Sequence, residues 1–228
     1  MGQKTASFRI LNKYPTFEIF PEHFFYRIRK FPCLPTNPRE YDSPPTDFTT
    51  DGRFNSKNLP VMYGSPDLQV CIHECRVTEE DDLYVATLTP TTPLCLLNLS
   101  VLLEDDVIPL NEFESLDMAV HMLFLAGSHS YDITRQISLA IHSAGYNDLI
   151  YPSYFSLLRI GAPPFETSYG ISHRRIPQFQ KHEQLKAIPN IAIFGHPIKE
   201  GKISVNCINR LILNRVEYGF HFGPIDFE

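Results

Sequence analysis

The order of hydrophobic and polar residues predicts short strands and helices that are joined by long irregular segments. Residues 24–29, Phe-Phe-Tyr-Arg-Ile-Arg, combine aromatic and β-branched side chains in the two-residue period of a strand. Tyr26 and Ile28 should share one face of this strand, and Arg27 should lie on the other. Similar apolar runs predict further strands at residues 61–63, 83–88, 94–99, 148–153 and 211–218, and a hairpin of residues 191–194 with 203–205.

Helical spacing of apolar residues is found in three other segments. The first predicted helix spans about residues 67–77, with Ser65 as its N-cap. The other two are expected at residues 117–125 and 133–143, and residues 161–190 are expected to be irregular. Strands are in the majority and helices lie between them, which favours an α+β fold.

Composition narrows the classes of function. The formal net charge is −6 and no basic run occurs, which argues against direct binding of nucleic acid. No apolar run is long enough for a membrane span, and the first 20 residues lack the apolar segment of a signal peptide. The five cysteines are scattered, as is typical of free thiols in a reducing compartment. We therefore expect a cytoplasmic protein, or one delivered into the cytoplasm of a target cell.

One stretch of the chain concentrates three different chemistries. Arg53 ends a long proline-rich loop, Tyr63 lies in a predicted strand, and Glu74 lies on the helix that follows. The residues one turn before Glu74 are apolar, so its carboxylate should lie near the inward face of the helix, where a charge requires a reason. The alternative is a surface ion pair of Glu74 with Arg76 or Lys57.

Other common chemistries find little support. The string Cys71-Ile72-His73-Glu74-Cys75 has potential ligands but no second pair at zinc-like spacing, so we expect no metal site and treat both cysteines as core residues. The chain contains no Gly-x-Ser-x-Gly and no Gly-x-Gly. A carboxylate beside an aromatic ring and guanidinium groups instead suits cleavage of an N-glycosidic bond, because it can hold a ribose hydroxyl and stabilise an oxocarbenium ion. Arginines would hold the diphosphate oxygens of such a substrate.

Several blocks, in order along the chain, resemble the RES-domain family, which is named for Arg, Glu and Ser. The resemblance covers roughly residues 24–155, and the segment 190–195 is similar to the tail of longer members. The matching blocks are Phe25-Tyr26-Arg27-Ile28, Gly52-Arg53-Phe54-Asn55, Val61-Met62-Tyr63-Gly64-Ser65-Pro66-Asp67 with Glu74, Tyr131 with Thr134-Arg135, and Asp148-Leu149-Ile150-Tyr151-Pro152-Ser153.

The resemblance implies an ADP-ribosyltransferase-like fold with mixed and antiparallel sheets and flanking helices. We expect a single RES-type domain over residues 1–228, with a core at about 24–155 and a C-terminal extension at about 156–228 packed on it. An acidic insertion near residues 102–116 and the extension depart from the compact members of the family. These two additions are compatible with a stand-alone effector or defence protein.

The family also implies an activity. Its members are typically toxins that break the nicotinamide–ribose bond of NAD⁺ with phosphate or water as acceptor, without a cofactor, and thereby deplete NAD⁺. Their usual partner is an antitoxin that occludes the active site. Two alternatives stay open: a mono-ADP-ribosyltransferase that modifies a protein, and an inactive module that binds a nucleotide or a protein. The oligomeric state is not fixed by the sequence.

By position, the resemblance gives each candidate residue a role. Arg27 and Arg53 would bind the diphosphate or an acceptor phosphate. Tyr63 would pack on the nicotinamide end of the substrate. Glu74 would hold the ribose hydroxyl and stabilise positive charge at the anomeric carbon. Ser153 would donate a hydrogen bond to phosphate or ribose at the edge of the pocket.

Overall fold

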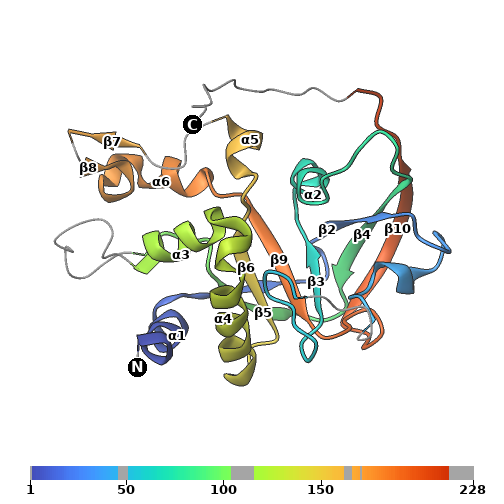
Figure 1. Ribbon diagram of the computed structural model, residues 1–228, viewed down its shortest axis with the longest axis horizontal. Coiled ribbons are helices and arrows are strands. Elements are labelled where there is room, and N and C mark those ends of the chain that lie inside the picture. The colour runs from blue at the N-terminus through green and yellow to red at the C-terminus, as the bar shows by residue number, and fades with distance from the viewer. Residues whose placement is uncertain (1, 46–50, 104–115, 162–165, 170, 216–228) are drawn as a thin grey trace, which may run out of the picture.

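The computed structural model describes residues 2–45, 51–103, 116–161, 166–169 and 171–215, and it has an α+β fold (Figure 1). The predicted fold class, with mixed and antiparallel sheets and flanking helices, is confirmed. The strands are β1 (Thr16–Ile19), β2 (Phe25–Lys30), β3 (Val61–Gly64), β4 (Leu83–Pro90), β5 (Leu94–Asn98), β6 (Asp148–Pro152), β7 (Thr167–Ser168), β8 (Ile171–Ser172), β9 (Pro189–Phe194) and β10 (Ile203–Leu211). The helices are α1 (Gly2–Lys13), α2 (Leu68–Glu74), α3 (Leu116–Leu125), α4 (Tyr131–Ser143), α5 (Ser156–Ile160) and α6 (Pro177–Leu185), with 3₁₀ turns at Pro38–Tyr41, Gly127–Ser130 and His173–Arg175.

Two sheets form the body of the protein. The larger has five strands in the order β1-β5-β6-β9-β3, in which β5 and β6 are parallel and the other neighbours are antiparallel. The smaller has three antiparallel strands in the order β10-β4-β2. Residues 189–194 therefore supply an interior strand of the larger sheet, and residues 203–211 supply an edge of the smaller one.

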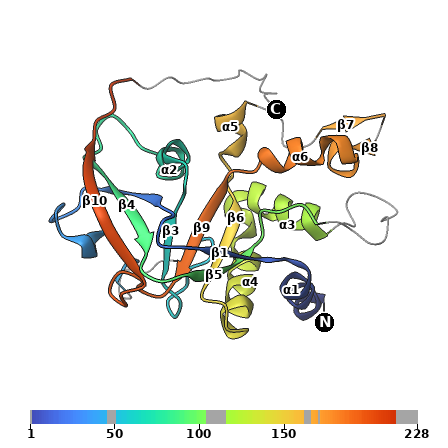
Figure 2. The same ribbon diagram turned by 180° about the vertical axis from the view of Figure 1, so that it is seen from behind.

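The five-stranded sheet is covered on both faces, which gives three layers (Figures 1 and 2). Helices α1, α3 and α4 pack on one face, and the three-stranded sheet packs on the other. Strand β9 shows the two-residue period of a strand buried on both sides: Ala192 and Phe194 face the helices, whereas Ile191 and Ile193 face the smaller sheet. Helix α2 packs on β2 and β4 through a separate apolar cluster that includes Ile28 and Cys71.

Most local predictions agree with the structure, but four do not. Residues 212–215 are not in a strand, so the strand predicted at 211–218 is not formed in its described part. The N-cap of α2 is Asp67, whose carboxylate accepts a hydrogen bond from the Val70 amide at 3.0 Å, and Ser65 is not the cap. Strands β9 and β10 do not form the predicted hairpin, because β9 pairs with β3 and β6 while β10 pairs with β4. Helix α6 lies in the segment expected to be irregular.

Several expectations fall partly or wholly beyond what the structure describes. Most of the acidic insertion and the end of the strand predicted at 211–218 lie outside the described residues. The division of the chain into a core and an extension near residue 155 stays a prediction. Within the described residues, none of the helices has the length and hydropathy required to cross a membrane.

Leu149 in β6 illustrates how the layers are held together. Its side chain has no exposed surface and belongs to the cluster between the helices and the five-stranded sheet. We expect Leu149→Ala to lower the free energy of unfolding by about 2–5 kcal/mol, because it removes buried apolar contacts and leaves a cavity. Leu185→Ala in α6 is the matched control, since Leu185 is 68% exposed. Urea denaturation that gave equal losses for both variants would contradict this placement.

Asp148, the first residue of β6, is a buried carboxyl group with an unusual environment. Neither of its carboxylate oxygens has a hydrogen-bond partner within the described residues. Burial raises the pKa of Asp148 from 3.8 to about 7, against the attraction of Lys202. Between about pH 4 and pH 7 the native protein therefore keeps a proton that the unfolded chain has released. The free energy of unfolding falls as pH rises through this range, because the unfolded state then binds fewer protons than the native state.

This placement predicts the effect of Asp148→Asn, which keeps the shape of the side chain but cannot ionise. The wild-type free energy of unfolding should fall between about pH 4 and pH 7 more steeply than that of the variant, and the variant should be the more stable protein at pH 8. Urea denaturation across this pH range measures both curves. Asp51→Asn, at an exposed position, is the control. Parallel curves for wild type and Asp148→Asn would rule out this account of the group.

Candidate active site

A cavity of about 380 Å³ opens where β2, β3, α2 and the loop before β3 meet. Four of the five residues singled out by the sequence, Arg27, Arg53, Tyr63 and Glu74, line it. The fifth, Ser153, reaches Glu74 by a hydrogen bond. The remaining lining residues are Ile28, Gly52, Asn55, Gly64, Ser65, Cys71, Cys75, Tyr131, Tyr151 and Asn190.

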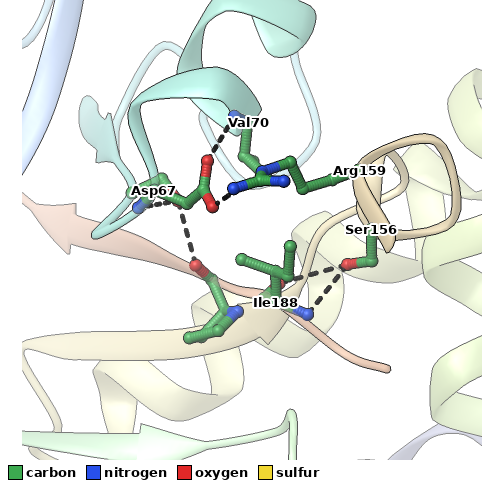
Figure 3. A network of polar contacts seen from close by, with 7 residues as sticks. Asp67, Val70, Ser156, Arg159 and Ile188 are labelled. Atoms are coloured by element: carbon green, nitrogen blue, oxygen red, sulfur yellow. Dashed lines mark hydrogen bonds and ion pairs between the residues drawn. The ribbon is translucent and has the colours of Figure 1, made fainter. Parts of the chain in front are cut away.

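Helix α2 is fixed at its N-terminus by polar contacts that reach two other segments (Figure 3). The second carboxylate oxygen of Asp67 pairs with Arg159 Nε of α5 at 3.2 Å. Ser156, also in α5, accepts a hydrogen bond from the Ile188 amide at 2.9 Å, just before β9. These bonds tie α2, α5 and the start of β9 to one another, and they set the position of Glu74 at the other end of α2.

The carboxylate of Glu74 is held by two neutral donors. Ser153 Oγ donates to Glu74 Oε1 at 2.7 Å, and Asn190 Nδ2 donates to the same oxygen at 2.7 Å. The other oxygen, Oε2, receives no hydrogen bond from a described residue. The ion pair with Arg76 or Lys57 that the sequence left open is not formed among the described residues. The Glu74 carboxylate is therefore held beside the cavity by neutral donors alone, with no ion pair to a described residue.

Arg53 is held between aromatic rings and the backbone. Its guanidinium carbon lies 5.6–5.8 Å from the ring centres of Phe124, Tyr131 and Tyr151, within the range of cation–π attraction. Its Nη1 donates to the Phe124 carbonyl oxygen at 3.1 Å, and its own carbonyl accepts a hydrogen bond from the Thr134 hydroxyl of α4. Arg53 forms no ion pair with a described carboxylate.

Arg27 is 7% exposed and is held by carbonyl oxygens. Its Nη1 donates to the Tyr63 carbonyl at 2.7 Å, and its Nη2 donates to the Asp42 carbonyl at 3.1 Å. The Asp42 carbonyl also accepts a hydrogen bond from Arg29 Nη2 at 2.9 Å. Burial, together with repulsion by Arg29, lowers the pKa of Arg27 to about 9, so its guanidinium remains charged at neutral pH. The anionic side-chain partner expected of a buried arginine is not found among the described residues.

Tyr63 uses its hydroxyl to organise the loop before β3. The hydroxyl donates to Asn55 Oδ1 at 2.8 Å and accepts from the Phe54 amide at 3.0 Å. Burial raises the pKa of Tyr63 above its ordinary value, so the phenol stays protonated and able to donate. Its ring lines the cavity and stacks on Phe54, with a centre-to-centre distance of 6.4 Å. Tyr63 therefore has a structural task in addition to the substrate contact predicted for it.

Cys71 of α2 and Cys75, the C-cap of this helix, also line the cavity. Burial raises the pKa of the Cys71 thiol to about 12, which keeps it protonated and poorly nucleophilic at neutral pH. Cys75 is shifted in the same direction by the same cause. Cys71 also packs in the cluster under α2, in line with the core role expected for it.

Elsewhere in the described part of the chain, Glu166, His173 and Glu183 bring potential metal ligands within 4.8 Å of one another. Lys186 Nζ pairs with Glu183 at 2.6 Å and also with Glu166. The ammonium group thus already supplies the positive charge that these carboxylates require, and the cluster is explained without a metal ion.

Asn190, Tyr151 and Asn55 contribute to the site but were not identified as site residues from the sequence. Asn190 is brought to the cavity by a contact between distant segments, since Asn190 and Glu74 are 116 residues apart. Asn55 follows Arg53 within one of the matching blocks, and this was an available signal. For Asn190 the signal was slight: a polar residue at the start of an otherwise apolar strand.

One family of known proteins matches most of the chain. The model of the RES domain matches residues 25–185, which is more than half of the chain, and the protein therefore belongs to the RES-domain family. Among solved structures, one similar chain comes from the M. tuberculosis MbcT–MbcA toxin–antitoxin complex, with 12% sequence identity, a TM-score of 0.46, and coverage of 91% of this chain and 92% of that chain. No curated protein matches the chain.

The double hydrogen bond of Tyr63 predicts a measurable loss when its hydroxyl is removed. Tyr63→Phe leaves the buried Phe54 amide without its acceptor and should lower the free energy of unfolding by about 1–3 kcal/mol. Tyr169→Phe is the matched control, because Tyr169 is fully exposed. Thermal and urea denaturation compare the two. If they were equally stable, the Tyr63 hydroxyl would have no part in holding the loop.

Proposed function

We propose that this protein is an enzyme that breaks the nicotinamide–ribose bond of NAD⁺, with phosphate or water as acceptor. Membership of the RES-domain family supports this class of activity. The arrangement of charges in the cavity supports it independently, because it combines cations for a diphosphate with a carboxylate for a developing cation. We also propose that loss of NAD⁺ makes the protein a toxin or effector in the cytoplasm where it acts.

The observation that carries this proposal is a cavity that joins two guanidinium groups and one carboxylate, none of which is in an ion pair with a described residue. Arg27 and Arg53 are held by carbonyl oxygens and aromatic rings, which orient a cation without neutralising it. An anion with several oxygens, such as a diphosphate, is the ligand that guanidinium groups bind best. The cavity volume lies within the range of small-molecule sites.

The carboxylate suits the chemistry of the step. When the bond between the ribose carbon and the nicotinamide nitrogen breaks, the bonding electrons leave with nicotinamide, whose ring becomes neutral. Positive charge then develops on the ribose carbon and its ring oxygen. A fixed negative charge stabilises this state more than the ground state, and such selective stabilisation lowers the barrier. Glu74 is the residue to which we assign this task, and its Oε2 would accept a hydrogen bond from a ribose hydroxyl.

The remaining residues would bind and orient. Arg27 and Arg53 would hold the diphosphate or an acceptor phosphate, and the ring of Tyr63 would pack on the nicotinamide end. The Ser153 hydroxyl donates to Glu74 Oε1, and we assign it to holding this carboxylate; its contact with phosphate or ribose stays a prediction. An antitoxin or immunity protein that covers the cavity would be the natural inhibitor of such an enzyme.

Nicotinamide release by the purified protein is the decisive measurement. We expect release from NAD⁺, and we expect Glu74→Gln to reduce the rate by about 10²–10³, the effect of removing one electrostatic stabiliser of a transition state. Glu18→Gln, on the exposed part of β1, is the matched control and should leave the rate unchanged.

The same assay identifies the acceptor. With phosphate present, phosphorus NMR should distinguish ADP-ribose 1″-phosphate from ADP-ribose, and radiolabel on an added protein would instead indicate ADP-ribosyl transfer. Absence of nicotinamide release with or without phosphate and protein acceptors would refute the proposed activity and favour a binding module. Full activity of Glu74→Gln would refute the assignment of Glu74.

A further inference from the structure

Asn190 is the second residue of the interior strand β9 and lies outside the residues matched by the family model. It is 2% exposed, it lines the cavity, and its Nδ2 donates to Glu74 Oε1 at 2.7 Å. We propose that Asn190 is a positioning residue for the reaction, which acts with Ser153 to hold one oxygen of Glu74 so that the other is presented to the ribose. This inference rests on the proposed function, since it concerns the carboxylate to which that function is assigned.

The two donors come from backbone segments that are themselves fixed. Asn190 lies opposite Tyr151 in the pairing of β9 with β6, and the Ser153 amide continues this pairing by donating to the Ile188 carbonyl at 2.9 Å. On the other side, Ser65 Oγ donates to the Pro189 carbonyl at 3.1 Å. The amide of Asn190 is therefore held in register with Ser153, and both donors converge on the same oxygen of Glu74.

The chemical type of the donors matters for catalysis. A lysine or arginine in place of Asn190 would hold the carboxylate equally well but would offset its negative charge. A hydroxyl and an amide fix its direction through charge-assisted hydrogen bonds and leave the charge in place. The charge then remains available to the cation that forms on the ribose. A positioning role of Asn190 differs from one of shape alone, because it depends on the N–H donor and not on the volume of the side chain.

Two substitutions of Asn190 distinguish donor from shape. Asn190→Ala removes the donor and should lower kcat for nicotinamide release by about 10- to 100-fold, the loss expected for a hydrogen bond to a charged group, with a much smaller change in KM. Asn190→Asp keeps the shape but places a second carboxylate against Glu74 and should be slower than Asn190→Ala at pH 8. Ser153→Ala removes the other donor to the same oxygen and should resemble Asn190→Ala.

A pH profile adds a readout that a purely structural role would not move. As pH falls from 8 to 5, the carboxyl introduced by Asn190→Asp takes up a proton and can donate again, so kcat of this variant should rise relative to wild type. Asn190→Ala should show no such rise. The charged and titratable groups around Glu74 that are common to all variants are Arg27, Arg53, Tyr63, Tyr131, Tyr151, Cys71, Cys75 and His73.

Asn209→Ala, at an exposed position of β10, is the matched control and should retain wild-type kcat. Rates of Asn190→Ala and Asn190→Asp within about twofold of wild type would overturn the inference, as would a faster reaction of Asn190→Asp than of Asn190→Ala at pH 8. If the wild type released no nicotinamide, the proposed function would fail instead. The inference would then be decided by a crystal structure of Asn190→Ala, in which an unchanged Glu74 carboxylate would overturn it and a rotated one would support it.

Discussion

The carboxylate of Glu74 is a negative charge at a cavity wall with no ion pair among the described residues, and much of the architecture serves to keep it there. Such a group loses hydration and is tolerated only when hydrogen bonds replace the lost water. The two donors that replace it belong to the end of β6 and the start of β9, so they converge only when these strands are neighbours. Helix α2 must also be docked on β2 and β4 to bring Glu74 to them. The order of strands, the docking of one helix and the position of one charge are thus parts of a single constraint.

The positive side of the cavity follows the same logic through Asp42. The carbonyl of Asp42 accepts hydrogen bonds from both Arg27 and Arg29, and its carboxylate accepts from the amides of Ile198 and Lys199. One residue in a proline-rich loop therefore joins the arginine-bearing strand to the turn after β9. Since the guanidinium groups are held by carbonyl dipoles rather than carboxylates, their charge is oriented but not cancelled. The guanidinium groups on this side of the cavity are thus fixed in position without being neutralised, as a site for an anion requires.

Local patterns were sufficient for features that depend on neighbouring residues. The alternation in β2 and the apolar runs of β3, β4 and β6 predicted strands that the structure contains, and the apolar turn before Glu74 predicted its inward direction. The family motifs pointed to four residues that line one cavity: Arg27, Arg53, Tyr63 and Glu74.

What the sequence did not provide depends on contacts between distant segments. The pairing of β9 and β10 could not be predicted, because two adjacent strands that look like a hairpin go to different sheets once the interior position beside β6 is available. The partner of Ser153 was missed for a similar reason: a hydroxyl at a strand end can serve a ligand or a side chain, and only the placement of α2 decides. Asp67 displaced Ser65 as the N-cap because Ser65 pairs with β2 and donates to Pro189 instead.

The interior position of β9 has a consequence for the synthesis of the protein. A ribosome makes residues 25–153, with every charged group of the cavity, well before it makes residues 189–194. Until β9 emerges, β6 and β3 lack their common neighbour and Glu74 lacks one of its two donors. A nascent or truncated chain that ends before β9 therefore carries the charged residues without the assembled site. This order of assembly delays the finished cavity until residues 189–194 have been made.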